Sequence, residues 1–327
     1  MKYVVPNIEF GKQTSNSIKG ILAIMVLVSH IHGRVDLFDG SIWGTVFSAF
    51  GYLAVSGFLF LSGYGLRKVS LTNSRYLADF PQKKIYPFYR ICCITILIYI
   101  IRDIVCGEEI SVFLILQSFL FGKTVVDNGW YLQTQFIFYI IFYFSYRQRG
   151  GNGRFWLFIL ISAYCILCPL LGLSTTWYEA GFCFAAGCVY AECEDRIIKY
   201  RNGSTGNKRY IQYMTVAICF FVALFFGNRA VLPNGMRIVV KMLSAILFAL
   251  LMMSVVSVIK ITNGIVRFLG KYSLEIYLLQ GIFLNAFIRC IKSITEWGYI
   301  LAVMISTILA AIVVHPLYSK IGTWGRK

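Results

Sequence analysis

The sequence predicts an all-α fold, a polytopic membrane helix bundle with about ten transmembrane helices and both termini in the cytoplasm. The first observation behind this prediction is composition: of the 327 residues, 58 % are hydrophobic and 14 % are charged, and the mean hydropathy is +0.70. Soluble domains carry roughly 25 % charged residues, so this chain has too few to cover a water-facing surface. The other two observations are a series of apolar segments and an uneven distribution of basic residues between the loops that join them.

Ten apolar segments account for the predicted helices, since a helix needs about 20 apolar residues to cross a bilayer core of about 30 Å. In chain order they are 18–31, 46–66, 88–105, 129–146, 155–171, 177–191, 210–227, 236–259, 264–288 and 297–318. No small-residue cleavage site follows the first, so we expect a retained helix rather than a cleaved signal peptide. Segment 177–191 is short and must be tilted, extended or shielded by its neighbours. The stretch 110–122 is too short to span and is predicted to be interfacial or re-entrant on the outer side.

The loops between these segments differ in charge. If they are assigned alternately to two sides, about three-quarters of the 31 lysines and arginines fall on the side of the N-terminus. The positive-inside rule places that side, with both termini, in the cytoplasm. The loops around Lys83 and Arg201 are then cytoplasmic, whereas Asp36, Glu108 and Arg229 face outward. Topology thus accounts for the formal charge of +17, and we expect no nucleic-acid partner.

The chain has no tandem repeat, low-complexity tract or interdomain linker, and its loops are short. We therefore expect a single integral-membrane domain over residues 1–327, with no soluble domain appended. Most of its ten cysteines lie inside apolar runs, where cysteine behaves as a small hydrophobe. These are Cys92, Cys93, Cys165, Cys168, Cys183, Cys188 and Cys219. The sequence CILCP at 165–169 has the C-x-x-C spacing but no second pair, so packing is favoured over redox or zinc chemistry.

The first segment carries two ionisable side chains, Lys19 and His30, separated by ten residues in "SIKGILAIMVLVSHIHGR" (Ser17–Arg34). At about 1.5 Å per residue, His30 lies roughly 16 Å beyond Lys19 along a helix. An ionisable group at that depth is costly unless it faces the bundle interior, which makes His30 a functional candidate. The alternative is that His30 marks the outer helix end, among the headgroups. His32 points about 200° away around the helix, so no metal site is predicted.

Three further stretches carry polar residues at the ends of apolar segments, and each has an ordinary structural explanation. In "GFLFLSGYGL" (Gly57–Leu66), small residues can pack helices. In "PQKKIYPFYR" (Pro81–Arg90), lysines can face lipid phosphates. "FLGKYSLEIYLLQ" (Phe268–Gln280) can be a helix start, and its Glu275 lies one turn beyond Lys271, which favours a structural ion pair over catalysis.

Taken together and in order, these stretches resemble the acyltransferase 3 family of integral-membrane acyltransferases. That family has a basic residue and a histidine ten residues apart in its first helix, an F-x-x-S-G-[YF] segment, a basic cluster leading into R-[IL]-x-P, a W-x-L segment and a late G-x-x-S-x-x-[IL]-Y-L-x-H segment. The corresponding positions here are Lys19 with His30, Phe58–Tyr64, Lys84–Pro87, Trp130–Leu132 and Gly270–Gln280. They extend over nearly the whole chain.

The chain departs from the family pattern at three places. Lys19 stands where arginine is usual. In its basic cluster the family has two arginines spaced three residues apart. Here Pro81 occupies the first of these positions and Lys84 the second, with Lys83 as a substitute for the first arginine. Lysine offers a point charge rather than a planar bidentate fork, so we expect a looser grip on phosphate. Gln280 replaces the final histidine of the late motif.

The resemblance implies transfer of an acyl group, most simply acetyl, from cytoplasmic acetyl-CoA or another acyl-CoA to a hydroxyl of a surface or secreted glycan or its lipid-linked precursor. It implies a multi-pass protein of the plasma or inner membrane, with acyl-CoA as donor substrate, no bound cofactor, and either a monomer or a homo-oligomer. His30 is then the catalytic base or the acyl carrier. Basic residues that would hold the CoA phosphates are Lys19, Lys83, Lys84 and Arg90. Residues that would line the tunnel or contact substrate are Ser62, Trp130, Tyr277 and Gln280.

Two other functions fit a polytopic bundle with buried polar groups. One is a transporter or flippase for a glycan or a lipid-linked substrate, although the sequence shows no inverted repeat and no matching broken helices in its two halves. The other is a relative that kept the fold and lost the chemistry, which the changes at Pro81 and Gln280 leave open.

Overall fold

The computed structural model describes residues 10–35, 38–120, 122–147, 151–201, 206–227, 233–259, 261, 263–290 and 295–323. Every regular element in this part is helical, as the sequence predicts. The α-helices are α1 (Lys12–His32), α2 (Ile42–Thr72), α3 (Tyr86–Val105), α4 (Val112–Phe119), α5 (Trp130–Arg147), α6 (Gly153–Leu170), α7 (Gly181–Arg201), α8 (Gly206–Gly227), α9 (Asn234–Val256), α10 (Gly264–Lys271), α11 (Ser273–Cys290) and α12 (Glu296–Thr323). A π-helical turn, η1 (Pro81–Ile85), leads into α3, and a 3₁₀ turn, η2 (Thr175–Trp177), leads into α7.

All ten predicted apolar segments fall on helices, and the short stretch 110–122 contains α4. Among the described residues, six helices are long and apolar enough to cross a membrane: α1, α2, α6, α8, α9 and α12. Glutamines and several tyrosines make α5 less apolar, and α7 continues into a charged stretch from Glu192 to Arg201. The number of spans and the cytoplasmic placement of the termini stay predictions. Asp36 and Arg229, which were expected to face outward, lie outside the described residues.

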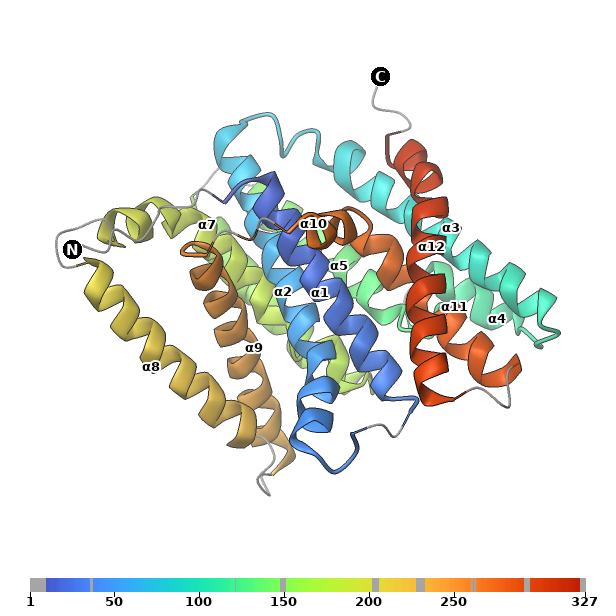
Figure 1. The fold of residues 1–327 in the computed structure, drawn as a ribbon. Helices are drawn as coiled ribbons and strands as arrows, with labels where there is room; N and C mark the ends of the chain where they lie inside the picture. Colours follow the sequence, from blue (N-terminus) through green and yellow to red (C-terminus); the bar gives the residue numbers. More distant parts are fainter. Residues whose placement is uncertain are drawn as a thin grey trace.

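The helices α1 and α2 lie at the centre of the bundle, with α7 packed on α2 and α10 packed across α1 (Figure 1). The pair α8 and α9 forms one edge, and α3 and α4 form the opposite edge. None of the residues in the apolar stretch of α8 is buried. Several of its large apolar side chains, among them Phe220, Val222 and Phe226, are exposed, as expected of a helix that contacts lipid, whereas Phe221 packs on Phe248 of α9. Cys219 is among these exposed residues, whereas Cys165, Cys168, Cys183 and Cys188 are buried, as predicted for packing residues.

Glycines allow the central helices to approach closely. A β-carbon on Gly63 of α2 would overlap the carbonyl oxygen of Phe184, and one on Gly187 of α7 would overlap that of Phe60. A β-carbon on Gly270 of α10 would likewise overlap the backbone carbonyl oxygen of Asn16 on α1. The two motif glycines, Gly63 and Gly270, thus serve helix packing, the ordinary role of small residues between membrane helices.

The ninth apolar segment is two helices rather than one. It breaks at Tyr272, between α10 and α11. The expected ion pair between Lys271 and Glu275 is wrong, because the break removes the regular spacing that would place these side chains one turn apart. Glu275 instead pairs with His315 of α12, whose Nδ1 lies 2.6 Å from Oε1 of the carboxylate.

Candidate functional site

A cavity of about 750 Å³, here called the lysine cavity, opens between α1, α2, α3, α5 and α11. Three lysines line it: Lys12 and Lys19 from α1, and Lys84 from the turn before α3. The described residues that line it include no aspartate and no glutamate. Three lysines in one concave site make it attractive to anions.

Helical spacing explains which basic residues reach the lysine cavity. Lys12 and Lys19 are seven residues apart, almost two full turns, so they share one face of α1. Sequence reasoning missed Lys12, although this spacing could have identified it. Lys84 shares its face with Phe88, which also lines the cavity. The neighbouring Lys83 points elsewhere and its Nζ donates to Oδ2 of Asp79 at 2.7 Å.

Arg90 and Lys83 are absent from the residues that line the lysine cavity, so the structure separates them from Lys19 and Lys84. Arg90 follows Lys84 by six residues, which turns it roughly 120° away around a helix. The sequence groups these basic residues in one short stretch. Only the direction in which each side chain leaves the helix distinguishes them.

The polar wall of the lysine cavity comes from α2 and α5. Nε2 of Gln135 donates a hydrogen bond to Oγ of Ser62 at 2.9 Å. Tyr131, Gln135 and Tyr139 are spaced four apart along α5, and all three line the cavity. Ser62 is therefore held with its hydroxyl at the cavity, while the adjacent Gly63 packs against α7.

A second cavity, of about 260 Å³, is here called the histidine cavity. His30 of α1, Trp130 at the start of α5 and Tyr277 of α11 line it, which brings together three residues that the sequence singled out. Glu179 and Lys241 also line it, and sequence reasoning missed both. The signal was present, because Glu179 lies in the sixth apolar segment and Lys241 in the eighth, and ionisable residues in such segments are rare.

One ring nitrogen of His30 makes no hydrogen bond to the described residues. Its Nδ1 is buried and has no hydrogen-bond partner within the part of the chain that the structure describes. The Gln280 side chain lies close enough to interact with the imidazole. Gln280 is 1 % exposed and lines neither cavity, and its Nε2 donates to the carbonyl oxygen of Tyr277 at 3.1 Å. Gln280 therefore lies near the His30 imidazole but outside both cavities.

His32 belongs to a different environment, as its place on the helix predicts. Its Nε2 lies 3.6 Å from Oδ1 of Asp39, and its ring contacts Phe47 at the start of α2. It is absent from the lining of both cavities. The two histidines near the end of α1 therefore do not act on one site.

Among the described residues that line the two cavities, Tyr277 is the one that both share. Its hydroxyl donates to the carbonyl oxygen of Asn128 at 2.9 Å. Asn128 has a φ of 58°, a left-handed conformation that asparagine tolerates better than most residues. Its neighbour Asp127 accepts hydrogen bonds from Arg102 at 2.8 Å and from Asn285 at 2.6 Å. These contacts fix the loop before α5 and hold Tyr277 between the cavities.

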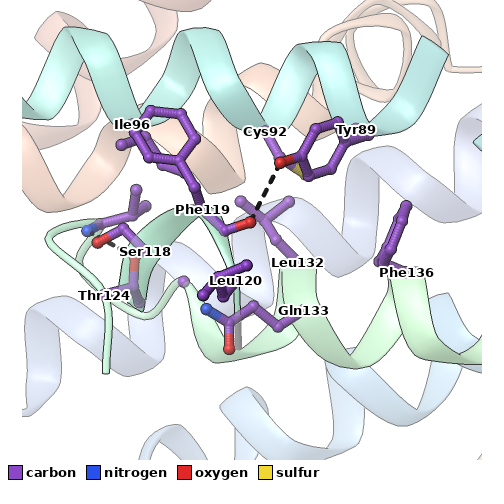
Figure 2. A pocket seen from close by; sticks show the side chains of 12 residues that line it. Tyr89, Cys92, Ile96, Ser118, Phe119, Leu120, Thr124, Leu132, Gln133 and Phe136 are labelled. Carbon is purple, nitrogen blue, oxygen red and sulfur yellow. Dashed lines mark hydrogen bonds between the residues drawn. The ribbon is translucent and has the colours of Figure 1, made fainter. Parts of the chain in front are cut away.

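A third cavity, between α3, α4 and α5, is too small to bind a substrate (Figure 2). Its volume is about 30 Å³, room for no more than a few water molecules. The Tyr89 hydroxyl donates to the carbonyl oxygen of Phe119 at 3.2 Å at its edge, and the lining is mostly apolar. It is a packing gap between the helices of this edge.

Comparison with known proteins gives one match. Residues 14–315 match the model of the acyltransferase 3 family, described as an acyltransferase domain. Neither a curated protein nor a solved structure matches the chain.

Proposed function

Because the chain belongs to the acyltransferase 3 family of membrane proteins, we propose that it is an O-acetyltransferase of the plasma or inner membrane. It moves an acetyl group from cytoplasmic acetyl-CoA to a hydroxyl of a surface or secreted glycan, or of its lipid-linked precursor. The lysine cavity is the main observation that supports this proposal. Its three cations, with no carboxylate among the described lining residues, suit a polyanionic donor.

The donor binds with its phosphates near Lys12, Lys19 and Lys84. These lysines are point charges with no fixed fork, so they attract the phosphates without setting one rigid geometry. The pantetheine arm then follows the polar wall at Ser62 and Gln135 toward Tyr277. His30 lies roughly 16 Å from Lys19 along α1, a distance that such an arm can cover.

The chemistry takes place at His30. In the direct route, the acceptor oxygen attacks the thioester carbonyl, the C–O bond forms and the C–S bond breaks. The hydroxyl proton passes to the imidazole, and the CoA thiolate leaves and is then protonated. In the covalent route, an imidazole nitrogen attacks the thioester carbonyl, the C–N bond forms, the C–S bond breaks and the CoA thiolate leaves. The acceptor oxygen then attacks the acetyl-imidazole, the C–O bond forms, the C–N bond breaks, and the hydroxyl proton passes to the CoA thiolate. Acid-quenched protein that retains label from the donor would identify the second route.

The test uses the full chain purified in detergent, acetyl-CoA labelled in its acetyl group, and the glycan fraction extracted from cells that lack the protein. We expect label in the glycan and release of one CoA for each acetyl group transferred. Binding of acetyl-CoA without turnover would instead indicate a non-catalytic relative. Movement of the glycan across vesicles without any use of acetyl-CoA would indicate a transporter. Glycan acetylation in cells with and without the protein provides an independent check.

A further inference from the structure

An ion pair in the histidine cavity has no part in the chemistry described above. Nζ of Lys241 donates to Oε2 of Glu179 at 3.1 Å, and both side chains line the cavity together with His30. Glu179 is 5 % exposed, and Lys241 lies 5.5 Å from the centroid of the Tyr52 ring. The two residues come from different parts of the chain, just before α7 and in the second turn of α9.

Such a pair is expensive to maintain in a membrane bundle. The Glu179 carboxylate is almost fully buried, whereas the Lys241 side chain is 29 % exposed, so the larger cost is that of withdrawing the carboxylate from water. The attraction of one ammonium offsets that cost fully only when further hydrogen bonds satisfy both groups. One bond between them leaves capacity for others: the ammonium has two more N–H donors, and the carboxylate has several lone pairs. The cavity wall therefore offers a strong donor next to a strong acceptor.

A pair of neighbouring hydroxyl groups matches this arrangement. A hydroxyl both donates and accepts, so one can donate to Glu179 while the next accepts from Lys241. Hydrogen bonds to charged groups are roughly twice as strong as neutral ones, which gives the contact both energy and direction. Asn128 and Thr176, which also line the cavity, add neutral polar groups, and Trp130 and Tyr52 add flat apolar surfaces.

The volume of the cavity limits what can enter. An engineered cavity of about 150 Å³ holds one benzene molecule. At about 260 Å³, the histidine cavity has room for one substituted six-membered ring and not for two.

We propose that Glu179 and Lys241 form the acceptor subsite, which binds two neighbouring hydroxyls of a single sugar ring and thereby directs another hydroxyl of that ring to His30. This inference rests on the proposed function and adds the residues that choose the acceptor. It also requires that the acceptor present one ring at a time, as a terminal residue of a glycan or a lipid-linked sugar does.

The test measures the Michaelis constant for the glycan and the Michaelis constant for acetyl-CoA separately. Purified wild type and Glu179→Gln are compared with labelled acetyl-CoA and the glycan fraction of cells that lack the protein. We expect Glu179→Gln to raise the apparent KM for the glycan at least tenfold, while the KM for acetyl-CoA changes less than twofold. Lys241→Gln should act in the same direction. Glu194→Gln is the matched control, because Glu194 of α7 is also a buried carboxylate, is paired with Lys68 of α2, and lines neither of the two cavities.

A single substitution leaves one buried charge unpaired and can unfold the protein. The double variant Glu179→Gln/Lys241→Gln avoids this by removing both charges together, and gel filtration with acetyl-CoA binding verifies its fold. An unchanged glycan KM in this folded variant would overturn the proposal, as would an equal rise in both Michaelis constants or a matching rise in Glu194→Gln. If Lys241→Gln alone raises the glycan KM, the subsite binds an anionic group instead, and the diol assignment is wrong. Absence of transfer by the wild type would refute the proposed function itself.

Discussion

The rings of Tyr131 and Tyr277 lie 4.8 Å apart, centroid to centroid, and are tilted by 60°. Tyr131 lines the lysine cavity, whereas Tyr277 lines both cavities. The two side chains therefore form part of the partition between the site proposed for CoA and the site proposed for the acceptor. In the proposed reaction, the thioester passes this partition to reach His30, and water is kept from following it.

Truncation of Tyr277 should connect the two cavities. We expect Tyr277→Ala to raise hydrolysis of acetyl-CoA in the absence of glycan several-fold, since excluding water is what protects a reactive group in a closed site. Tyr277→Phe keeps the ring and loses only the hydrogen bond to Asn128, so its hydrolysis should stay near that of the wild type. Tyr139→Ala is the control, because Tyr139 lines the lysine cavity alone. Equal hydrolysis in Tyr277→Ala and Tyr139→Ala would contradict a partition at Tyr277.

Two adjacent lysines provide a test of the donor site. Lys84→Glu should raise the apparent KM for acetyl-CoA because a carboxylate repels the phosphates that the lysine attracts. The effect should shrink as salt is added, since the screening length falls from about 10 Å at 0.1 M to about 3 Å at 1 M. Lys83→Glu makes the same charge change one residue away, outside the lysine cavity, and should change the KM much less. Similar effects of both substitutions would show that only the general charge of this face matters.

His30 is tested by two substitutions. His30→Ala should lower kcat by about 10² to 10⁴, the range for loss of a general acid–base group, with acetyl-CoA binding intact. His30→Gln keeps a hydrogen-bonding group of similar size that takes up no proton at neutral pH. If both variants fold, bind donor and lack turnover, the chemistry depends on the imidazole. Activity restored by glutamine would instead give His30 a packing role. His32→Ala, which changes the side chain beside Asp39, should cost little.

The glycine contact between α2 and α7 predicts a difference in stability within one helix. Gly63→Ala places a β-carbon against the carbonyl of Phe184 and should destabilise the protein by about 1–3 kcal/mol, as overpacking does. At Gly65, two residues further along α2, an added β-carbon meets nothing within 4 Å. Gly65→Ala should therefore be neutral or stabilising, by up to about 1 kcal/mol from helix propensity. Thermal unfolding of both variants in detergent measures the difference, and equal midpoints would contradict the close approach.

The orientation in the membrane is a separate prediction. The excess of lysine and arginine on one side predicts that both termini lie in the cytoplasm. A reporter that is active only in the cytoplasm, fused after Lys327, should be active, and one fused within the loop at Glu108 should be silent. A silent fusion after Lys327 together with an active fusion at Glu108 would reverse the orientation and the route proposed for acetyl-CoA.

Some features of this protein were determined by the sequence alone. Composition and apolar segment lengths give the helical membrane class, because a chain with 14 % charged residues cannot solvate a globular surface. Lys19 and His30 are on one helix, so their separation follows from the rise per residue. The spacing of four along Tyr131, Gln135 and Tyr139 likewise gives these side chains a shared face, because helical periodicity alone requires it. These are local relationships, set by the geometry of one element.

The tertiary structure decided which polar groups from different helices share a site. Glu179 and Lys241 are 62 residues apart in the chain, and only the packing of α7 and α9 against α2 brings them together beside His30. Glu275 pairs with His315 rather than Lys271 because the helix breaks at Tyr272, a break that the apolar pattern does not show. The direction of each side chain around the helix separated Lys84 from its neighbour Lys83. Burial in a bundle depends on contacts between distant segments, and those contacts are not encoded in the order of residues along any one helix.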